Sequence, residues 1–355
     1  MKNQGLMSKP TIGYRTLSRK REDGFSLMEM LVALAIFLVI SAAAFSLVQK
    51  HQQLFSRQQA QAGVNYTMRD GIGQLEIDAV NAGAGLSQVM QHPMGITITN
   101  NAGAYDAMTI FSIDSSVPPA NPAPQTGTSC KSTTSSTLFL TPVDPSVSMA
   151  TEAGFFHSGD NVLLVQTDGA GNITGITTIA LTKDAQTAGF KVQIDHNPTG
   201  TNEDPLGISN SASLTAKNNA IGFVFCGTNA YALKLLPPIT YSVDTTTTPT
   251  NPTLIKTVNG VSSVISEQVV GFKVGASVRN NTGTVDYYYN GAAQTPGEGC
   301  TSNCGYDSDW SQIRSIRATL TARSSTTTPV GNAAAYRVEA ASVVINPRNL
   351  SMNDQ

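Results

Sequence analysis

The chain has 355 residues, only 13% of them charged, and its formal net charge at pH 7 is -2. A chain of this length can bury a substantial core in one large domain or two ordinary ones without a metal. Residues 1–23 carry six basic and two acidic side chains, which leaves a charge of -6 on the rest. The folded part therefore lacks the clustered positive charge of nucleic-acid-binding proteins, and we predict no nucleic-acid partner.

An apolar stretch begins at Phe25. Residues 25–48 read FSLMEMLVALAIFLVISAAAFSLV and contain a single charge, Glu29. As a helix this stretch would be about 36 Å long, enough to cross a hydrocarbon core of about 30 Å. Because Arg19, Lys20 and Arg21 precede it, the positive-inside rule places residues 1–24 in the cytoplasm and the chain after about residue 50 across the membrane.

Three explanations compete for this stretch. A secretory signal peptide has a basic start, an apolar centre and a small-residue cleavage site, which Ala42-Ala43-Ala44 supplies. An ordinary signal anchor would keep the same helix uncleaved as a membrane tether. Neither accounts for Glu29, because an unpaired carboxylate in an apolar run costs several kcal/mol.

The residues around Glu29 resemble a known signal. Gly24-Phe25-Ser26-Leu27-Met28-Glu29, followed by MLVALAIFLVI, is similar to the class III signal of type IV prepilins and type II secretion pseudopilins. The resemblance implies cleavage by a membrane-embedded prepilin peptidase after Gly24 and N-methylation of Phe25. It also implies that Glu29 docks the subunit by meeting the N-terminal amine of a neighbour. An intramembrane carboxylate is tolerated beside such a cationic partner, which supports this role independently.

The helix is predicted to continue beyond the membrane as an amphipathic segment over residues 49–85. No proline occurs between Gln49 and Asn81, and apolar residues recur on one helical face at Met68, Ile72, Leu75 and Ala79. We interpret this stripe as the surface that packs against a sheet. Gly71 and Gly73 weaken the helix and allow a bend, and Gly83 and Gly85 are expected to end it.

After about residue 95, short apolar runs alternate with clusters of Gly, Asn, Pro and Thr, a pattern typical of antiparallel strands. One long helix followed by many short strands predicts an α+β fold, in which the helix packs on a large antiparallel β-sheet domain spanning residues 86–355. The expected strands are 96–99, 107–113, 137–141, 162–167, 173–181, 190–194, 221–226, 231–235, 239–243, 254–258, 269–278, 285–289, 313–323 and 336–345.

Low-complexity segments mark the expected loops of this domain. Residues 117–137 are rich in Pro, Ser and Thr, residues 245–253 read TTTTPTNPT, and residues 291–309 are rich in Gly. Surface loops between strands explain these segments more economically than linkers between domains.

Four cysteines allow three disulfide pairings. We favour a small ring between Cys300 and Cys304, with Cys130 paired to Cys226, because the latter two flank strand-like runs. A four-thiolate metal site is the alternative, but scattered cysteines lack the close paired spacing of zinc ribbons. Disulfides fit a domain in an oxidising compartment.

A second resemblance covers about 110 residues near the C-terminus. The segments PPITYSVDTTTTPTNPTLIKTVNG, ISEQVVGFKVGASV, DWSQIRSIRATLTARS and AYRVEAASVVINPRN are similar to the C-terminal half of PilW-type minor pilins, whose pseudopilin counterpart is the J-type subunit. In that family the last strand ends in Arg-Asn, here Arg348-Asn349. Residues 95–235 resemble no family that we can name.

Catalytic motifs are not apparent, and neither an enzyme activity nor a cofactor is predicted. The four histidines, at positions 51, 92, 157 and 196, show no paired metal spacing, and no nucleophile motif or P-loop occurs. Acidic residues gather near the expected Cys300–Cys304 ring, and we favour a solvated acidic loop there over a calcium site; these residues are Asp286, Glu298, Asp307 and Asp309. The run 287–289 of three tyrosines fits an outward-facing strand or an adhesion surface.

These observations together predict a non-catalytic minor pilin of the PilW kind. It would lie in the inner membrane with its domain in the periplasm and then join a surface pilus through contacts with major and minor pilins. A J-type pseudopilin of type II secretion is the nearest alternative. A secreted or anchored β-rich binding protein with an ordinary signal sequence is an alternative from another class.

Overall fold

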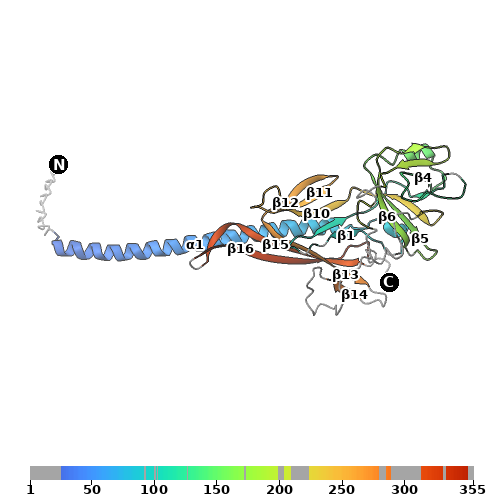
Figure 1. Cartoon of the computed structure of the whole chain (residues 1–355). Coiled ribbons are helices and arrows are strands. Elements are labelled where there is room, and N and C mark those ends of the chain that lie inside the picture. Colours follow the sequence, from blue (N-terminus) through green and yellow to red (C-terminus); the bar gives the residue numbers. More distant parts are fainter. Residues whose placement is uncertain are drawn as a thin grey trace, which may run out of the picture. The chain divides into compact units, whose positions relative to one another are not determined.

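The structure is a computed structural model, shown in Figure 1. It describes residues 25–350 apart from 92, 100, 102, 126, 172, 199–203, 209–223, 280–284, 289–312 and 331–332. The chain divides into two compact units, residues 1–55 and residues 56–355. The described part of the first unit is helical, whereas the second unit holds all the described strands.

One long helix, α1 (Leu27–Val80), forms the N-terminal part of the described chain. Within the second unit its buried residues recur three or four positions apart, at Val64, Met68, Gly71, Leu75 and Ala79. Gly83 and Gly85 follow with φ of 72° and 83°, a left-handed conformation that ends the helix as predicted. A short 3₁₀ turn, η1 (Leu86–Gln88), leads into the strands.

Two antiparallel sheets pack against the buried face of this part of α1. The first has the order β1-β2-β10-β11-β12, formed by β1 (Ile96–Thr99), β2 (Ala107–Ile110), β10 (Ile239–Asp244), β11 (Thr253–Val258) and β12 (Val261–Ser266). The second has the order β14-β13-β15-β16, formed by β13 (Val269–Arg279), β14 (Val285–Tyr288), β15 (Ile313–Val330) and β16 (Ala333–Ile345).

Residues of both sheets share one hydrophobic core with α1. On β15, Ile316, Ala318 and Leu320 alternate with more exposed residues, as expected for a strand with one buried face. They join Leu75 and Tyr241 in a single cluster, which we call the helix core. Its burial holds the second half of α1 on the sheets.

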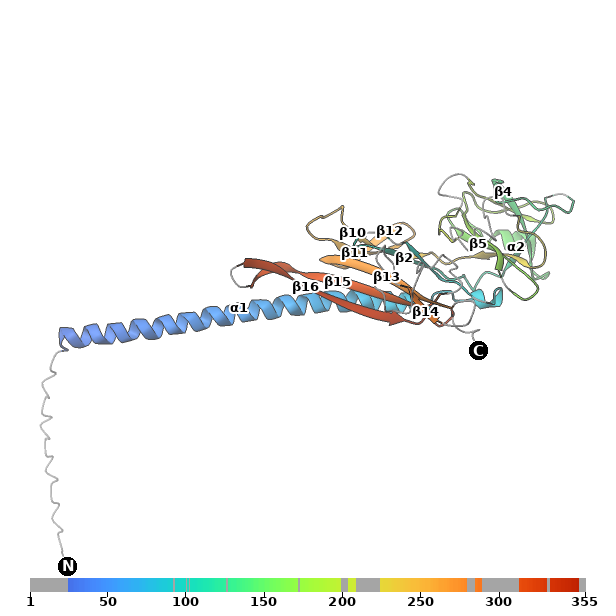
Figure 2. The ribbon, with the colours of Figure 1, turned by 60° about the horizontal axis from the view of Figure 1, so that its bottom comes forward.

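A third sheet is inserted in the chain between β2 and β10 (Figure 2). Its order is β6-β5-β9-β3-β4-β8-β7, and a short helix, α2 (Met149–Ala153), precedes β5. Its strands are β3 (Ala120–Pro122), β4 (Thr137–Pro142), β5 (Asn161–Thr167), β6 (Ile173–Ala180), β7 (Gln186–Thr187), β8 (Val192–Asp195) and β9 (Ala230–Lys234).

Both faces of the inserted sheet are buried around β5. Leu163 and Val165 belong to the helix core, whereas Val162 and Leu164 belong to a separate cluster, which we call the insert core. The side chains of a strand alternate between its two faces, so this near-continuous apolar run fits a strand covered on both sides.

The predicted α+β class is confirmed, and most predicted strands are present within one or two residues. Some details differ from the prediction. Residues 224–226 of the expected strand 221–226 are not in a strand, because the chain turns at Gly227, with φ of 91°, before β9 begins. The strand expected from Phe190 begins at Val192, because Phe190 lies in the turn between β7 and β8 and is 90% exposed.

Candidate functional site

The first turn of α1 contains a reciprocal pair of hydrogen bonds between Ser26 and Glu29. The Ser26 amide donates to Glu29 Oε2 at 3.0 Å, and the Glu29 amide donates to Ser26 Oγ at 3.2 Å. This is a capping box, which satisfies two backbone donors that a helix start otherwise leaves unpaired. The negative carboxylate also lies at the positive end of the helix dipole, where it is stabilised.

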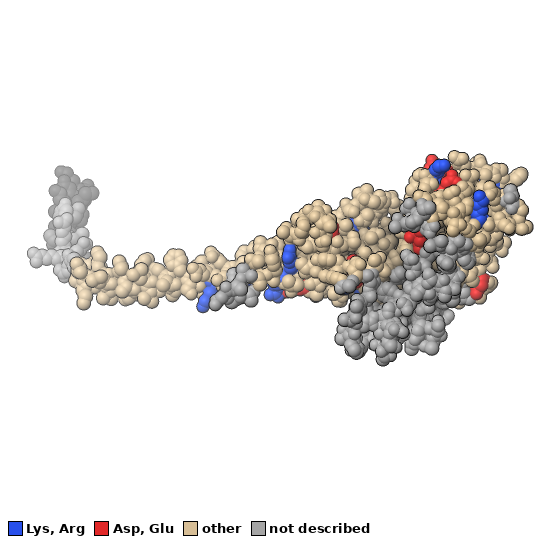
Figure 3. All heavy atoms as spheres, in the orientation of Figure 1, with Lys and Arg blue, Asp and Glu red and all other residues tan. Residues whose placement is uncertain are grey.

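The side chains around this turn are apolar and exposed. Phe25 is 84% exposed, and Phe37 and Phe45 are 67% and 70% exposed. The most apolar part of α1 has no buried residue, and α1 is long and apolar enough to cross a membrane. Figure 3 shows this part of α1 almost without charged side chains. Such a surface needs lipid or other protein around it.

Glu29 is the one acidic residue in this apolar surface, and it forms no ion pair among the described residues. The capping box supplies one hydrogen bond but no compensating charge. In a membrane the carboxylate therefore still lacks a cation. Gly24, on the other side of the expected cleavage site, lies outside the described residues.

The other half of α1 is tied to the first sheet through Asp78. Lys256 Nζ lies 2.6 Å from Asp78 Oδ2, and the Tyr241 hydroxyl donates to the same oxygen. Burial, together with the hydrogen bond to the Asp78 carboxylate, raises the pKa of Tyr241, which keeps the phenol protonated. These contacts fix the rotation of the helix on the sheet.

A disulfide joins Cys130 and Cys226, the pairing that the sequence favoured, with a Cα to Cα distance of 5.7 Å. The two cysteines precede β4 and β9, so the bond links segments 96 residues apart within the inserted sheet. Cys300 and Cys304, the other predicted pair, lie outside the described residues.

The described residues contain no group of three or more His, Cys, Asp or Glu side chains that could hold a metal. Of the acidic residues considered for calcium, Glu298, Asp307 and Asp309 lie outside the described part, and so does His92. His51 and His157 are exposed and His196 is buried, in different parts of the chain.

Ser26 is a functional candidate that the sequence analysis quoted within a motif without giving it a role. The spacing Ser-x-x-Glu before an apolar run is the signature of a capping box, so the signal was present in the sequence. The structure thus adds a positioning residue next to Glu29.

The comparisons with known proteins agree with this geometry. Residues 19–45 match the family described as prokaryotic N-terminal methylation motif. Neither the curated proteins nor the solved structures contain a match to the chain. The methylation motif, on a helix that starts with a capped Glu29 and exposes an apolar surface, supports a type IV pilin-like or pseudopilin protein.

Proposed function

We propose that this chain is a minor pilin of the PilW kind, which acts without catalysis in the initiating or tip complex of a type IV pilus. The precursor is held in the inner membrane by residues 25–48, with its β-rich domain in the periplasm. Prepilin peptidase cleaves after Gly24, and the freed amine of Phe25 is methylated. The apolar helix then moves from lipid into contact with major and minor pilins.

Glu29 is the observation that carries this proposal. A carboxylate in an apolar, exposed helix surface is costly unless a cation meets it, and the described residues supply none. A newly formed α-amine on an adjacent subunit is such a cation, and it exists only after cleavage. The capping box holds the carboxylate at the first turn, close to the terminus that cleavage creates.

The mass of the mature N-terminal peptide tests the processing step. We expect a chain that begins with N-methylated Phe25. A chain that begins at Phe45 would instead support secretion through an ordinary signal sequence, and an intact bond before Phe25 would support a plain membrane anchor. Either result contradicts the proposal.

A J-type pseudopilin is the second candidate, because the same motif and helix serve both assemblies. The two differ in partners rather than in the physics of assembly. Co-purification from cells separates them, since a minor pilin brings down pilus subunits and a pseudopilin brings down secretion components.

A further inference from the structure

A cleft of about 750 Å³ lies where the inserted sheet meets the first sheet, inside the second unit. One wall comes from the start of β5 and the end of β9, and the other from β10, β11 and the turn at Asn259 and Gly260. Its volume is in the range of small-molecule binding sites, which often lie between substructures. The proposed pilin function leaves this cleft unused.

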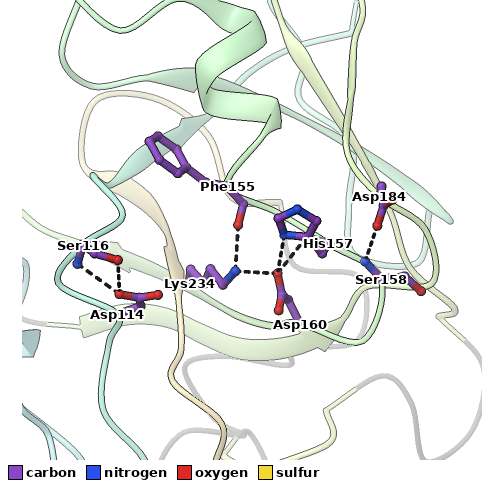
Figure 4. A network of polar contacts seen from close by, with 8 residues as sticks. All are labelled: Asp114, Ser116, Phe155, His157, Ser158, Asp160, Asp184 and Lys234. Atoms are coloured by element: carbon purple, nitrogen blue, oxygen red, sulfur yellow. Dashed lines mark hydrogen bonds and ion pairs between the residues drawn. The ribbon is translucent and has the colours of Figure 1, made fainter.

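The charged groups in the cleft are largely compensated (Figure 4). Lys234 Nζ lies 2.8 Å from Asp160 Oδ2 and donates to the Phe155 carbonyl at 2.7 Å. The Lys234 side chain is only 16% exposed. A charged ligand would therefore have to compete with an ion pair that is already formed.

Asp114 adds a carboxylate to the cleft, and only one of its two oxygens accepts hydrogen bonds from described residues. The Ser116 amide and hydroxyl both donate to Asp114 Oδ1, and these bonds, led by the hydroxyl, lower the pKa of Asp114. Asp114 Oδ2 has no hydrogen-bond partner within the described chain. It is available as an acceptor at the edge of the cleft.

Neutral polar groups complete the lining. The side-chain amides of Asn161 and Asn259 have no partner among the residues that the structure describes. Leu236, which is 44% exposed, and the adjacent Pro237 and Pro238 add an apolar wall. The cleft thus offers both donors and acceptors beside an apolar surface, and Asp114 is its one charged lining residue without an ion-pair partner among the described residues.

We infer that this cleft binds a neutral oligosaccharide. Sugar hydroxyls both donate and accept, so they match a lining that mixes free amides, a free carboxylate oxygen and an ammonium group. The apolar wall suits the C–H face of a sugar ring. An anionic ligand would meet the unpaired carboxylate of Asp114, because Asp160 is already paired with Lys234. A cation paired with Asp114 is the competing outcome, and the test below includes it.

Saturation-transfer NMR with the full-length chain tests this inference, in a detergent without a sugar headgroup. The probes are lactose, which is a galactoside, and chitobiose, which is an N-acetylated amino sugar. Comparing the two signals shows which of these two classes of sugar the cleft binds. We expect signal from at least one disaccharide, and about a tenfold weaker affinity in Asn259→Gly and in Lys234→Gln, the loss of one or two hydrogen bonds. Glycine tolerates the φ of 51° at position 259, so this variant keeps the turn.

Lys183→Gln is the matched control, because Lys183 also pairs with an aspartate of the inserted sheet, Asp195, but does not line the cleft. Its affinity should equal that of the unmodified chain. Absence of signal with both disaccharides overturns the inference, and so does a signal that Asn259→Gly leaves unchanged. Tighter binding of spermidine or glucuronate than of either disaccharide also overturns it. None of these results bears on cleavage or assembly.

Discussion

Buried ionisable groups are paired in the helix core but have no hydrogen-bond partner beside the insert core, among the residues that the structure describes. In the helix core, Asp78 is paired with Lys256, and the fully buried side chain of Asp106 accepts from Lys273 at 2.9 Å and from the Val274 amide at 3.0 Å. Beside the insert core, the carboxyl oxygens of Glu152 and the ring nitrogens of His196 are buried without any hydrogen-bond partner among the described residues. The Asp78 pair therefore holds α1 on the first sheet, and the Asp106 pair joins the segment before β2 to β13. The inserted sheet instead carries groups whose protonation affects its stability.

Burial shifts both unpaired groups toward their neutral forms. It raises the pKa of Glu152 to about 7, and it lowers the pKa of His196 despite the opposing effects of the Ser135 backbone and of the charge of Asp195. The inserted sheet also contains a disulfide, which the described part of the helix core lacks. The two regions should accordingly respond differently to substitution and to pH.

Asp78→Ala should produce the largest effect. It leaves Lys256 and the Tyr241 hydroxyl partly buried without their partner, which costs about 3 to 5 kcal/mol of unfolding free energy for a buried pair. Chemical denaturation of the full-length chain measures the loss. Asp70→Ala, an exposed aspartate on the same helix, is the control and should change stability by less than about 0.5 kcal/mol. Equal losses in both variants would refute the pairing role of Asp78.

Removal of the disulfide should act on the insert alone. Cys130→Ala combined with Cys226→Ala opens a link between segments 96 residues apart, with an expected cost of about 2 to 4 kcal/mol. Hydrogen exchange locates the effect, because amides of β4 and β9 should lose protection while those of β15 and β16 keep it. Uniform loss across all sheets would show that the two cores unfold as one.

Deprotonation of Glu152 should make the inserted sheet less stable as pH rises. The folded state holds the Glu152 proton up to about pH 7, whereas an unfolded glutamate releases it near pH 4.5. The folded state therefore binds more protons between these values, so the unfolding free energy falls across this window and stays low above pH 7. We expect a loss of roughly 1 to 3 kcal/mol.

Glu152→Gln keeps a neutral side chain of the same size and should remove this slope. Unfolding of both chains at pH 4.5, 6 and 8 isolates the effect, because His196 contributes the opposite slope, a loss below its usual pKa of 6.5, to both. An unchanged slope in Glu152→Gln would mean that Glu152 is ionised in the folded insert.

Substitution of two glycines of α1 by alanine should give the smallest changes in stability, with opposite signs. A Cβ at Gly71 would lie 2.7 Å from Cδ2 of Leu320 and 2.9 Å from Oγ of Ser266, whereas a Cβ at Gly73 would meet nothing within 4 Å. Gly71→Ala should destabilise by about 1 to 2 kcal/mol, because overpacking outweighs the gain in helix propensity. Gly73→Ala should stabilise by up to about 1 kcal/mol. Thermal unfolding of the two variants compares them directly, and the same sign for both would contradict the close packing at Gly71.

Local patterns in the sequence predicted much of the fold. Gly83 and Gly85 end α1, the stripe that includes Met68 and Leu75 is buried, and β1 occupies its predicted residues 96–99. The motif around Glu29 was visible because its specificity lies in adjacent residues. The sequence could not show that position 71 has no room for a side chain, because Leu320 approaches it from a strand about 250 residues later in the chain.

The organisation of the sheets could not be read from local patterns. β3 (Ala120–Pro122) lies within a segment rich in Pro and Ser that was expected to be a loop, and it is a strand because β4 and β9 pair with it. The insertion of a whole sheet between β2 and β10 likewise depends on pairing between distant segments. The cleft at Lys234 and Asp114 forms only when these segments meet.

Filament incorporation of Glu29→Gln tests most directly whether the Glu29 carboxylate meets the terminal amine of a neighbour. Glutamine keeps the size and hydrogen bonding of the side chain but not its charge. We expect it to be lost from sheared filaments while the β-rich domain unfolds at the same temperature as in the unmodified chain. Ser26→Ala removes the capping hydroxyl but keeps the carboxylate and the backbone amide that positions it, so this variant should still be incorporated. Normal incorporation of Glu29→Gln would contradict the proposed pairing.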